Sequence, residues 1–148
     1  MATSVGMAIA SRWLASRYNR PDQPLFDFRV YAHAGDRCMM EGISSEAASL
    51  AGHLKLSNLC WIYDNNHITI EGNIKLAFSE NVEARFQAYD WNVVRVSDAN
   101  DLDHLRWAFQ TFQGTRDKPT LIIVDSHIAF GLAKSWPGSV SFSKRWNQ

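Results

Sequence analysis

The amino-acid sequence predicts an α/β domain with three layers, α/β/α, built on a mainly parallel sheet. Two apolar stretches, residues 59–63 and 120–125, have the length of strands that are covered on both faces. Segments with helical spacing of apolar residues separate the expected strands, and strands that alternate with helices form parallel sheets. A length of 148 residues suits one domain with a single core.

The first half of the chain is expected to form helix, strand, helix and strand. Apolar side chains recur at helical spacing over residues 4–18 and 40–55, which predicts two helices. A strand is expected over 27–33, running directly into Gly35, and the next over 59–63. Each expected strand is therefore followed by a polar turn.

The second half repeats this order. Ser79 is expected to cap a helix that precedes a strand over 91–96, and Asn100 to cap the following helix, which Gly114 ends. The last strand is expected over 120–125, after Pro119. The apolar face expected for the last helix consists of Leu102, Leu105, Phe109 and Phe112.

The predicted domain covers residues 1–131, and residues 132–148 are expected to form an irregular tail because they show neither period. Basic residues (15) balance acidic residues (15), so no global charge favours nucleic acid or an anionic membrane. The longest apolar run near the N-terminus, 5–10, has no basic residues before it, so we expect neither a signal peptide nor a membrane span there. We expect a soluble, cytoplasmic protein.

Two cysteines, Cys38 and Cys60, lie in apolar surroundings in the sequence. We expect both to be small buried residues of a reducing compartment, and not a disulfide.

Oxygen-bearing side chains follow two of the expected strands. Gly35 permits a tight turn before Asp36, and Asp64, Asn65 and Asn66 follow the next strand. Ligands of open parallel sheets bind at the carboxyl ends of the strands, and Mg²⁺ combines a few protein oxygens with phosphate oxygens. A metal-bound diphosphate is one interpretation. An ordinary α/β loop is the alternative, because glycine and aspartate are common there.

Other catalytic or metal-binding patterns find less support. The five histidines show no shared metal-ligand spacing. Asp125, Ser126 and His127 are triad residue types, but consecutive residues of a strand point to opposite faces. Asp101 and His104 are expected to form a solvated helical pair.

The strand-end residues closely resemble the transketolase family. The similar blocks include GDRCMMEGISSEAASLAGHLKLSN from Gly35, WIYDNNHITIEG from Trp61 and PTLIIVDSHIAFG from Pro119. The likeness covers about residues 5–131 and includes the thiamine diphosphate signature, a GDG triplet followed by paired asparagines. Here Asp36 and Asn66 occupy those places.

The resemblance implies thiamine diphosphate and Mg²⁺ as cofactors, and transfer of a two-carbon ketol unit between sugar phosphates. It implies that Asp36 and Asn66 bind the metal by side chains and Ile68 by its backbone carbonyl. Glu41 would contact the acid that activates the cofactor's aminopyrimidine, which in the family belongs to another domain of a partner subunit. The residues implied to contact the cofactor are Gly35, Asp36, Arg37, Asn66, Ile68, Ile70 and Ile128.

The sequence departs from the family in three respects, one of which is that the family continues after Gly131 to a further histidine motif and this sequence does not. Arg37 replaces the last glycine of the triplet, where backbone approaches the diphosphate; an arginine there can clash, extend to solvent or pair with a phosphate. Dihydroxyacetone synthases resemble this motif with a small residue at that place. The chain also lacks the family's upstream glycine-rich loop and its pyrimidine-binding and C-terminal domains. We therefore expect no turnover by this chain alone, or, alternatively, a non-catalytic module that pairs with a full-length relative or a complementary half.

Overall fold

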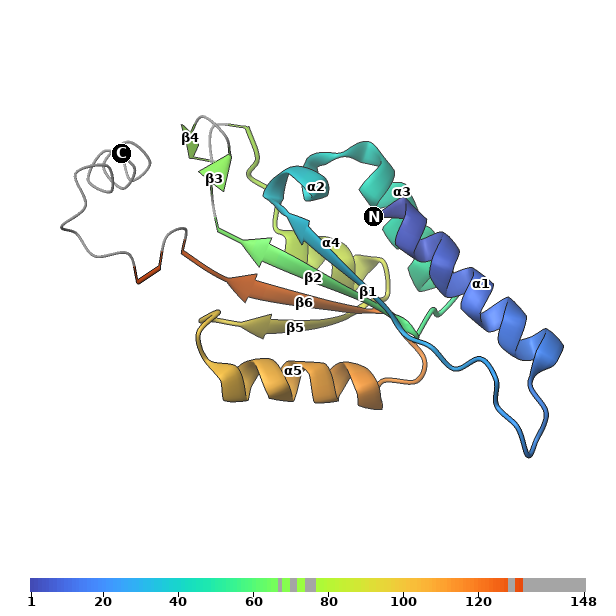
Figure 1. Ribbon diagram of the computed structural model, residues 1–148. Coiled ribbons are helices and arrows are strands. Elements are labelled where there is room, and N and C mark those ends of the chain that lie inside the picture. Colours follow the sequence, from blue (N-terminus) through green and yellow to red (C-terminus); the bar gives the residue numbers. More distant parts are fainter. Residues whose placement is uncertain (67, 70–71, 74–76, 128–129, 132–148) are drawn as a thin grey trace.

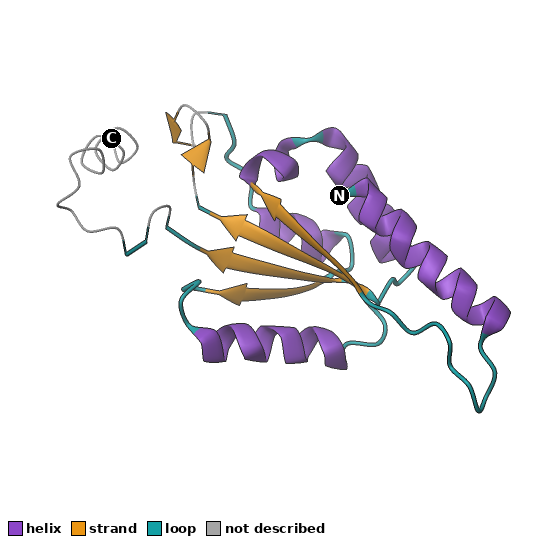
Figure 2. Cartoon of the chain, viewed as in Figure 1, coloured by secondary structure: helices purple, strands orange, loops and turns teal. Residues whose placement is uncertain are grey.

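A four-stranded parallel sheet forms the centre of the protein, with helices on both faces (Figures 1 and 2). The computed structural model describes residues 1–66, 68–69, 72–73, 77–127 and 130–131. Across the sheet, the strands lie in the order β1 (Val30–Gly35), β2 (Leu59–Asn65), β6 (Thr120–Asp125) and β5 (Asn92–Val96). The predicted three-layer α/β/α architecture with a parallel sheet is confirmed.

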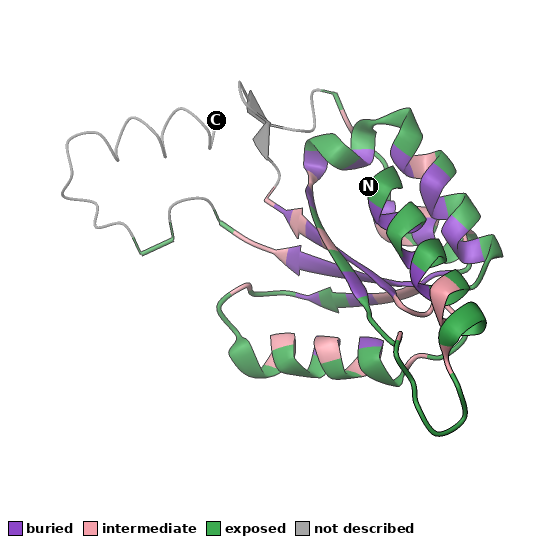
Figure 3. Ribbon diagram, turned by 45° about the vertical axis from the view of Figure 1, so that its right-hand side comes forward, coloured by how far each residue is buried: buried purple, intermediate pink, exposed green. Residues whose placement is uncertain are grey.

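One face of the sheet carries the larger core. Helices α1 (Ala2–Tyr18), α3 (Gly42–His53) and α4 (Val82–Ala88) cover it. At its centre the rings of Trp61 and Trp91 lie 4.8 Å apart between centroids. Figure 3 shows the buried residues of α1 and α3 turned toward the strands.

The opposite face is covered by α5 (Leu102–Gly114). The step from β5 back to β6 runs against the direction of the earlier steps across the sheet, so a right-handed crossover must use the other face. Ala108 and Phe112 of α5 are fully buried against β5 and β6. Leu102, expected on the same apolar face, is instead 70% exposed, because it is the first residue of the helix.

The helix expected over 40–55 is confirmed as α3, and a short helix that was not expected precedes it. The short α2 (Asp36–Met40) begins directly after β1, and Glu41 then interrupts the helical conformation with extended backbone (φ −72°, ψ 131°) before α3. Helix α2 is fixed by the buried Met39, whose carbonyl accepts a hydrogen bond from the Arg85 guanidinium at 3.0 Å. A residue of α4 thus holds α2 in place.

Both helix caps lie one or two residues beyond the expected ones. Asn81, and not Ser79, accepts a backbone N–H of the first turn of α4 at 3.0 Å. Asp101, and not Asn100, caps α5 by accepting the His104 backbone N–H at 2.9 Å. Asp101 and His104 are therefore a cap and its backbone donor, in an exposed contact. In each case, several polar residues close together in the sequence could have served as the helix cap.

Two short strands were not expected. They are β3 (Ile68–Thr69) and β4 (Gly72–Asn73), which pair antiparallel beyond the end of β2. The expected tail, 132–148, lies outside the described residues. In the ranges given above, no helix has both the length and the apolar character needed to cross a membrane.

Candidate functional site

The carboxyl ends of β1, β2 and β6 lie in register. Gly35 of β1 is the register partner of Asp64, and Asn65 is the partner of Asp125. The polar residues that follow these strands therefore come together at one edge of the sheet. Ligands of open parallel sheets bind at this edge, outside the carboxyl ends of the strands.

Asp36 is buried at the start of α2, with only 2% of its surface exposed. Its Oδ1 accepts a hydrogen bond from the Tyr63 hydroxyl. Burial, together with the hydrogen bond to Asp36 and the charge of that carboxylate, raises the pKa of Tyr63 above its ordinary range. The phenol therefore keeps its proton at neutral pH and acts as a donor.

Asn66 lies on the other side of the strand end and is oriented by Asp64. Its Nδ2 donates to Asp64 Oδ2 at 3.0 Å, and Asp64 Oδ1 accepts from the Ser126 hydroxyl. A carboxylate only accepts hydrogen bonds, so Asp64 selects the amide nitrogen of Asn66. The amide oxygen of Asn66 consequently faces away from Asp64.

A third group of contacts joins β2 to β6 and β5. Asn65 Nδ2 donates to Asp125 Oδ1 at 2.6 Å, while Asn65 Oδ1 lies 3.2 Å from the Tyr63 hydroxyl. The Arg95 guanidinium binds both oxygens of Asp125 at 2.9 Å. Paired hydrogen bonds of this kind fix the orientation of both groups.

The remaining residues implied by the family resemblance occupy different positions. Arg37 is exposed in the first turn of α2, and Glu41 is exposed at the junction of α2 and α3. Gly35 has extended backbone (φ −99°, ψ −178°), so the turn expected to need glycine does not require it. The backbone of Ile68 lies in β3, which contacts α2. Ile70 and Ile128 lie outside the described residues.

The donor set is compatible with a small hard cation. Asp36, Asn66 and the Ile68 backbone offer a carboxylate, an amide and a carbonyl oxygen, the ligand types that Mg²⁺ prefers. Within the described ranges, no group of three or more histidine, cysteine, aspartate or glutamate side chains could hold a metal. A metal held by Asp36, Asn66 and Ile68 would use one carboxylate, an amide and a carbonyl oxygen, together with oxygens of a ligand.

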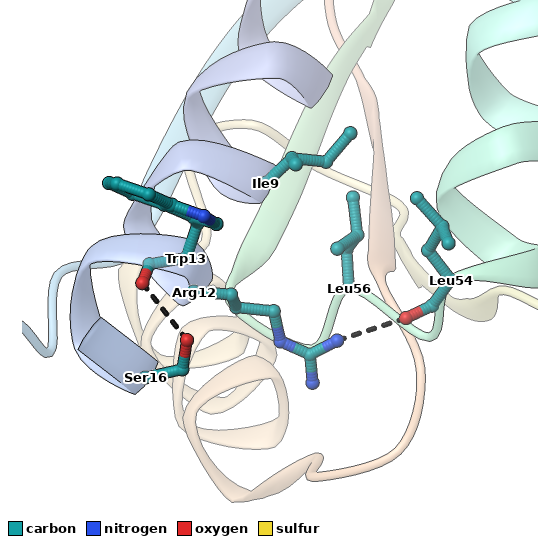
Figure 4. A pocket seen from close by; sticks show the side chains of 6 residues that line it. All are labelled: Ile9, Arg12, Trp13, Ser16, Leu54 and Leu56. Atoms are coloured by element: carbon teal, nitrogen blue, oxygen red, sulfur yellow. Dashed lines mark hydrogen bonds between the residues drawn. The ribbon is translucent and has the colours of Figure 1, made fainter.

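A hollow of about 300 Å³ lies elsewhere, between α1 and the segment that precedes β2 (Figure 4). The Arg12 guanidinium spans it and donates to the Leu54 carbonyl at 2.9 Å. The residues that line it are Ile9, Arg12, Trp13, Ser16, Leu54 and Leu56. Because Leu56 precedes β2, the hollow belongs to the amino ends of the strands and is separate from the oxygen-rich edge.

Sequence reasoning identified the motif residues but missed those that hold them. Tyr63, Ser126 and Arg95 were assigned no role, although each binds a carboxylate at the strand ends. One signal was available for Tyr63: it lies two residues before Asn65, and side chains two residues apart in a strand point to the same face. Which strand neighbours β2 could not be read from the sequence, so the contributions of β5 and β6 were not predictable.

Comparison with known families identifies the whole described region. The family model described as "Transketolase, thiamine diphosphate binding domain" matches residues 1–140. A probable transketolase of Schizosaccharomyces pombe is 48% identical over 132 residues, which are 88% of this chain and 19% of that protein. A chloroplastic transketolase of Arabidopsis thaliana is 47% identical over 132 residues, 88% of this chain and 18% of that protein.

Solved structures agree with the sequence matches. Transketolase of Pichia stipitis in complex with sedoheptulose 7-phosphate superposes with a TM-score of 0.82 at 44% identity, over 84% of this chain and 18% of that one. Transketolase of Campylobacter jejuni gives a TM-score of 0.83 at 38% identity, over 90% of this chain and 20% of that one. The chain thus spans about a fifth of the relatives it matches.

Proposed function

Because the chain belongs to the transketolase family, through its thiamine diphosphate binding domain, we propose that the strand-end site binds thiamine diphosphate together with Mg²⁺. The observation that carries this proposal is the buried Asp36 carboxylate, placed after β1 on the edge where Asn66 follows β2. Asp36, Asn66 and the Ile68 carbonyl would hold the metal. The metal would in turn hold the diphosphate.

When bound, thiamine diphosphate supplies an electron sink for breaking and forming carbon–carbon bonds. This chain's part is to bind and orient the cofactor. Tyr63 keeps a proton on its hydroxyl and holds one oxygen of Asp36, while Asp64 orients the Asn66 amide. Ile70 and Ile128 would complete an apolar pocket for the thiamine rings.

Glu41 would act only with a partner domain. Its side chain is exposed where α2 meets α3, and within the described part no hydrogen bond of its carboxylate holds it to the helix that follows. We propose that it contacts the acid of a pyrimidine-binding domain, supplied by a transketolase subunit or a complementary half. In that arrangement it would orient a proton-transferring group without itself touching the sugar phosphate.

The side chain of Arg37 affects whether the diphosphate can bind beside Asp36. The side chain is exposed and therefore does not fill the space beside the buried Asp36. We propose that it is tolerated, with its charge available to a phosphate oxygen.

Calorimetric titration tests the binding proposal. Thiamine diphosphate is titrated into the parent chain and into Asp36→Ala and Arg37→Gly, with and without Mg²⁺. We expect saturable, Mg²⁺-dependent binding by the parent and by Arg37→Gly, and none by Asp36→Ala. Asp103→Ala is the matched control, since Asp103 is exposed on α5 and pairs with Arg106.

Three results would contradict parts of this proposal. Binding by Asp36→Ala equal to that of the parent would remove the proposed metal site. Binding by Arg37→Gly but not by the parent would show that the arginine disables the site. Failure of both chains to bind would overturn the binding function altogether.

We further propose that the chain alone does not transfer ketol units. It spans about a fifth of its relatives, and the transketolase reaction would require the rest of the active site. The test measures transfer from xylulose 5-phosphate to ribose 5-phosphate by the purified chain, before and after addition of a transketolase subunit. Transfer by the chain alone, free of contaminating enzyme, would overturn the proposal of inactivity.

A second candidate is a non-catalytic module that pairs with a transketolase subunit or a complementary half. Large exposed apolar side chains on α1 and α3 favour it, among them Met7, Trp13 and Ile43. Free thiols suit a reducing compartment, and we place this role in the cytoplasm. Co-purification with a transketolase subunit, unchanged by Asp36→Ala, would support the module and separate it from cofactor binding.

A further inference from the structure

A hydrogen-bonded chain of side chains crosses the carboxyl end of the sheet and ends on Asp36. We propose that Tyr63 is a positioning residue, which holds the Asp36 carboxylate in the orientation for metal binding, and that the edge strand β5 sets the orientation of the Asn65 amide beside Tyr63 through this chain. The inference rests on the proposed function of Asp36. Its members are Arg95, Asp125, Asn65, Tyr63 and Asp36.

The chain lies on one face of the sheet. Residues 63 and 65 of β2 point to the same face, because side chains alternate along a strand. Asp125 is the register partner of Asn65 in β6, and Arg95 of β5 reaches Asp125 from the next strand. Three neighbouring strands thus supply consecutive links on the face that α4 covers.

The order of donors and acceptors along the chain is fixed by chemistry. Arg95 can only donate, and Asp125 can only accept, so Asp125 must take the amide nitrogen of Asn65. Asn65 Oδ1 then faces the Tyr63 hydroxyl, at 3.2 Å. An amide oxygen cannot donate, so Tyr63 is the donor in this contact. Its one hydroxyl proton therefore has two acceptors, Asn65 Oδ1 and Asp36 Oδ1.

Asp36 takes the stronger of these two bonds. A bond from a hydroxyl to a charged carboxylate is shorter and stronger than one to a neutral amide. Tyr63 is nearly fully buried, so water does not compete for its hydroxyl. One carboxylate oxygen of Asp36 is therefore fixed relative to β2, which sets the plane of the carboxylate.

If the Asp125 acceptor is changed to an amide, the order of the chain is lost. In Asp125→Asn, the new amide group can donate to Asn65, whose own amide can then turn over and present its nitrogen to Tyr63. Tyr63 would accept from Asn65 and keep its one hydroxyl proton for Asp36, so the bond to Asp36 would persist without the competing amide oxygen. The substitution thus changes the partners of Tyr63 without changing a residue that contacts Asp36.

Two measurements on Tyr63→Phe, Asp125→Asn and the double variant test the inference. The first is the Mg²⁺ concentration that half-saturates thiamine diphosphate binding. We expect Tyr63→Phe to raise it about tenfold, by analogy with the loss of groups that orient metal ligands, and Asp125→Asn not to raise it, because Tyr63 keeps its proton for Asp36. The double variant should match Tyr63→Phe.

The second measurement needs no cofactor. Urea unfolding of the unliganded chains gives an unfolding equilibrium constant for each variant, and the double-variant cycle gives the coupling between residues 63 and 125. We expect the combined effect to differ from the product of the single effects by about threefold or more. A merely structural role of each residue by itself would leave the two effects independent.

Tyr89→Phe is the matched control. Tyr89 is partly buried beside the same core, and its ring packs 6.0 Å from that of Phe86. It should change neither the Mg²⁺ requirement nor the effect of Asp125→Asn. A similar shift of the Mg²⁺ requirement in this control would overturn the assignment to Tyr63.

The two measurements separate this inference from the proposed function. If the parent binds no cofactor, the proposed function fails, and the coupling in the unliganded chain decides whether the hydrogen-bonded chain links residue 63 to residue 125. Independent effects at residues 63 and 125 would overturn the inference, whether or not the cofactor binds. An unchanged Mg²⁺ requirement in Tyr63→Phe would overturn it even where binding is seen.

Discussion

Cys38 and Cys60 have opposite surroundings. Cys60 is fully buried on the face of β2 that α5 covers, whereas Cys38 is exposed on α2. Because only an accessible thiolate reacts, we expect one thiol of the folded chain to react promptly with dithionitrobenzoate and the other only on unfolding. Cys38→Ser should abolish the prompt reaction. Two prompt thiols would contradict this assignment.

Alkaline pH should weaken the fold through Cys60. Burial raises the pKa of the Cys60 thiol from 9.0 to about 12. Between these values the unfolded chain loses a proton that the folded chain keeps, so the free energy of unfolding falls by about 1.4 kcal/mol per pH unit. This stability is complete below pH 9 and lost as pH approaches 12.

The measurement is urea unfolding at pH 8.5 and 10.5 under reducing conditions. The parent should lose about 2 kcal/mol more over this interval than Cys60→Ala, whose own cavity lowers stability equally at both values. Tyr63 adds to the alkaline loss in both chains, because its pKa is also raised. Equal losses in the two chains would exclude a role for the buried thiol.

At the same scale, the sequence predicted the ligand types of the site but not their support. Asp36 and Asn66 were recognisable because they follow strands and match a family motif. Tyr63 and Arg95 contact carboxylates on neighbouring elements, Asp36 and Asp125. Sequence spacing does not show which strands are neighbours in the sheet. Cys38 was expected to be buried, but it lies in the short, unexpected helix α2, where its side chain is exposed.

At the scale of elements, continuous apolar strands were the most predictable parts. The last strand, Thr120–Asp125, has the expected bounds because residues 121–124 are all buried and apolar and Pro119 precedes the strand. Helix ends were less predictable, since several residues near each start could act as a cap. Only the backbone conformation of the residue before the helix distinguishes Asn81 from Ser79.

The cap of α4 can be tested by a pair of alanine substitutions. Asn81→Ala removes the side-chain oxygen that accepts the N–H of Ala84, so we expect the free energy of unfolding to fall by about 1 kcal/mol. Ser79→Ala, two residues earlier and exposed, should change it by less than about 0.5 kcal/mol. Urea unfolding compares them, and a larger loss in Ser79→Ala would reassign the cap.

The packing of α3 against the end of α4 depends on Gly52. A Cβ atom there would lie 1.8 Å from the Tyr89 carbonyl oxygen, so Gly52→Ala must displace backbone. We expect a loss of about 1–3 kcal/mol in the free energy of unfolding, although alanine is the better helix former.

Gly6→Ala is the matched control for this substitution. Gly6 lies within α1, and nothing is within 4 Å of an added Cβ atom. The same change should therefore stabilise the fold by about 0.5–1 kcal/mol. Thermal and urea unfolding of both variants measure the difference, and effects of the same sign would contradict the close approach at Gly52.

At the scale of the whole molecule, the two faces of the sheet are covered unequally. Among the described residues, α1, α3 and α4, together with Met39 of α2, cover one face, and α5 covers the other. Apolar side chains nevertheless remain exposed on the outer surface of the three-helix layer, where Ile9, Trp13 and Leu54 surround the hollow of Figure 4. Exposed apolar patches of this kind mark interaction surfaces, which bears on the second candidate function.

We expect the isolated chain to associate with itself through this α1 surface. Trp13 is 59% exposed and lines the hollow, and tryptophan contributes strongly to interfaces when it becomes buried. Sedimentation velocity should show a coefficient that rises with protein concentration, and Trp13→Ser should raise the dissociation constant about tenfold or more. Trp107→Ser removes an equally large side chain, 51% exposed on α5, and should have no effect. Equal effects of the two substitutions would indicate non-specific association of apolar surface, and a single species at all concentrations would exclude this surface as an interface between copies.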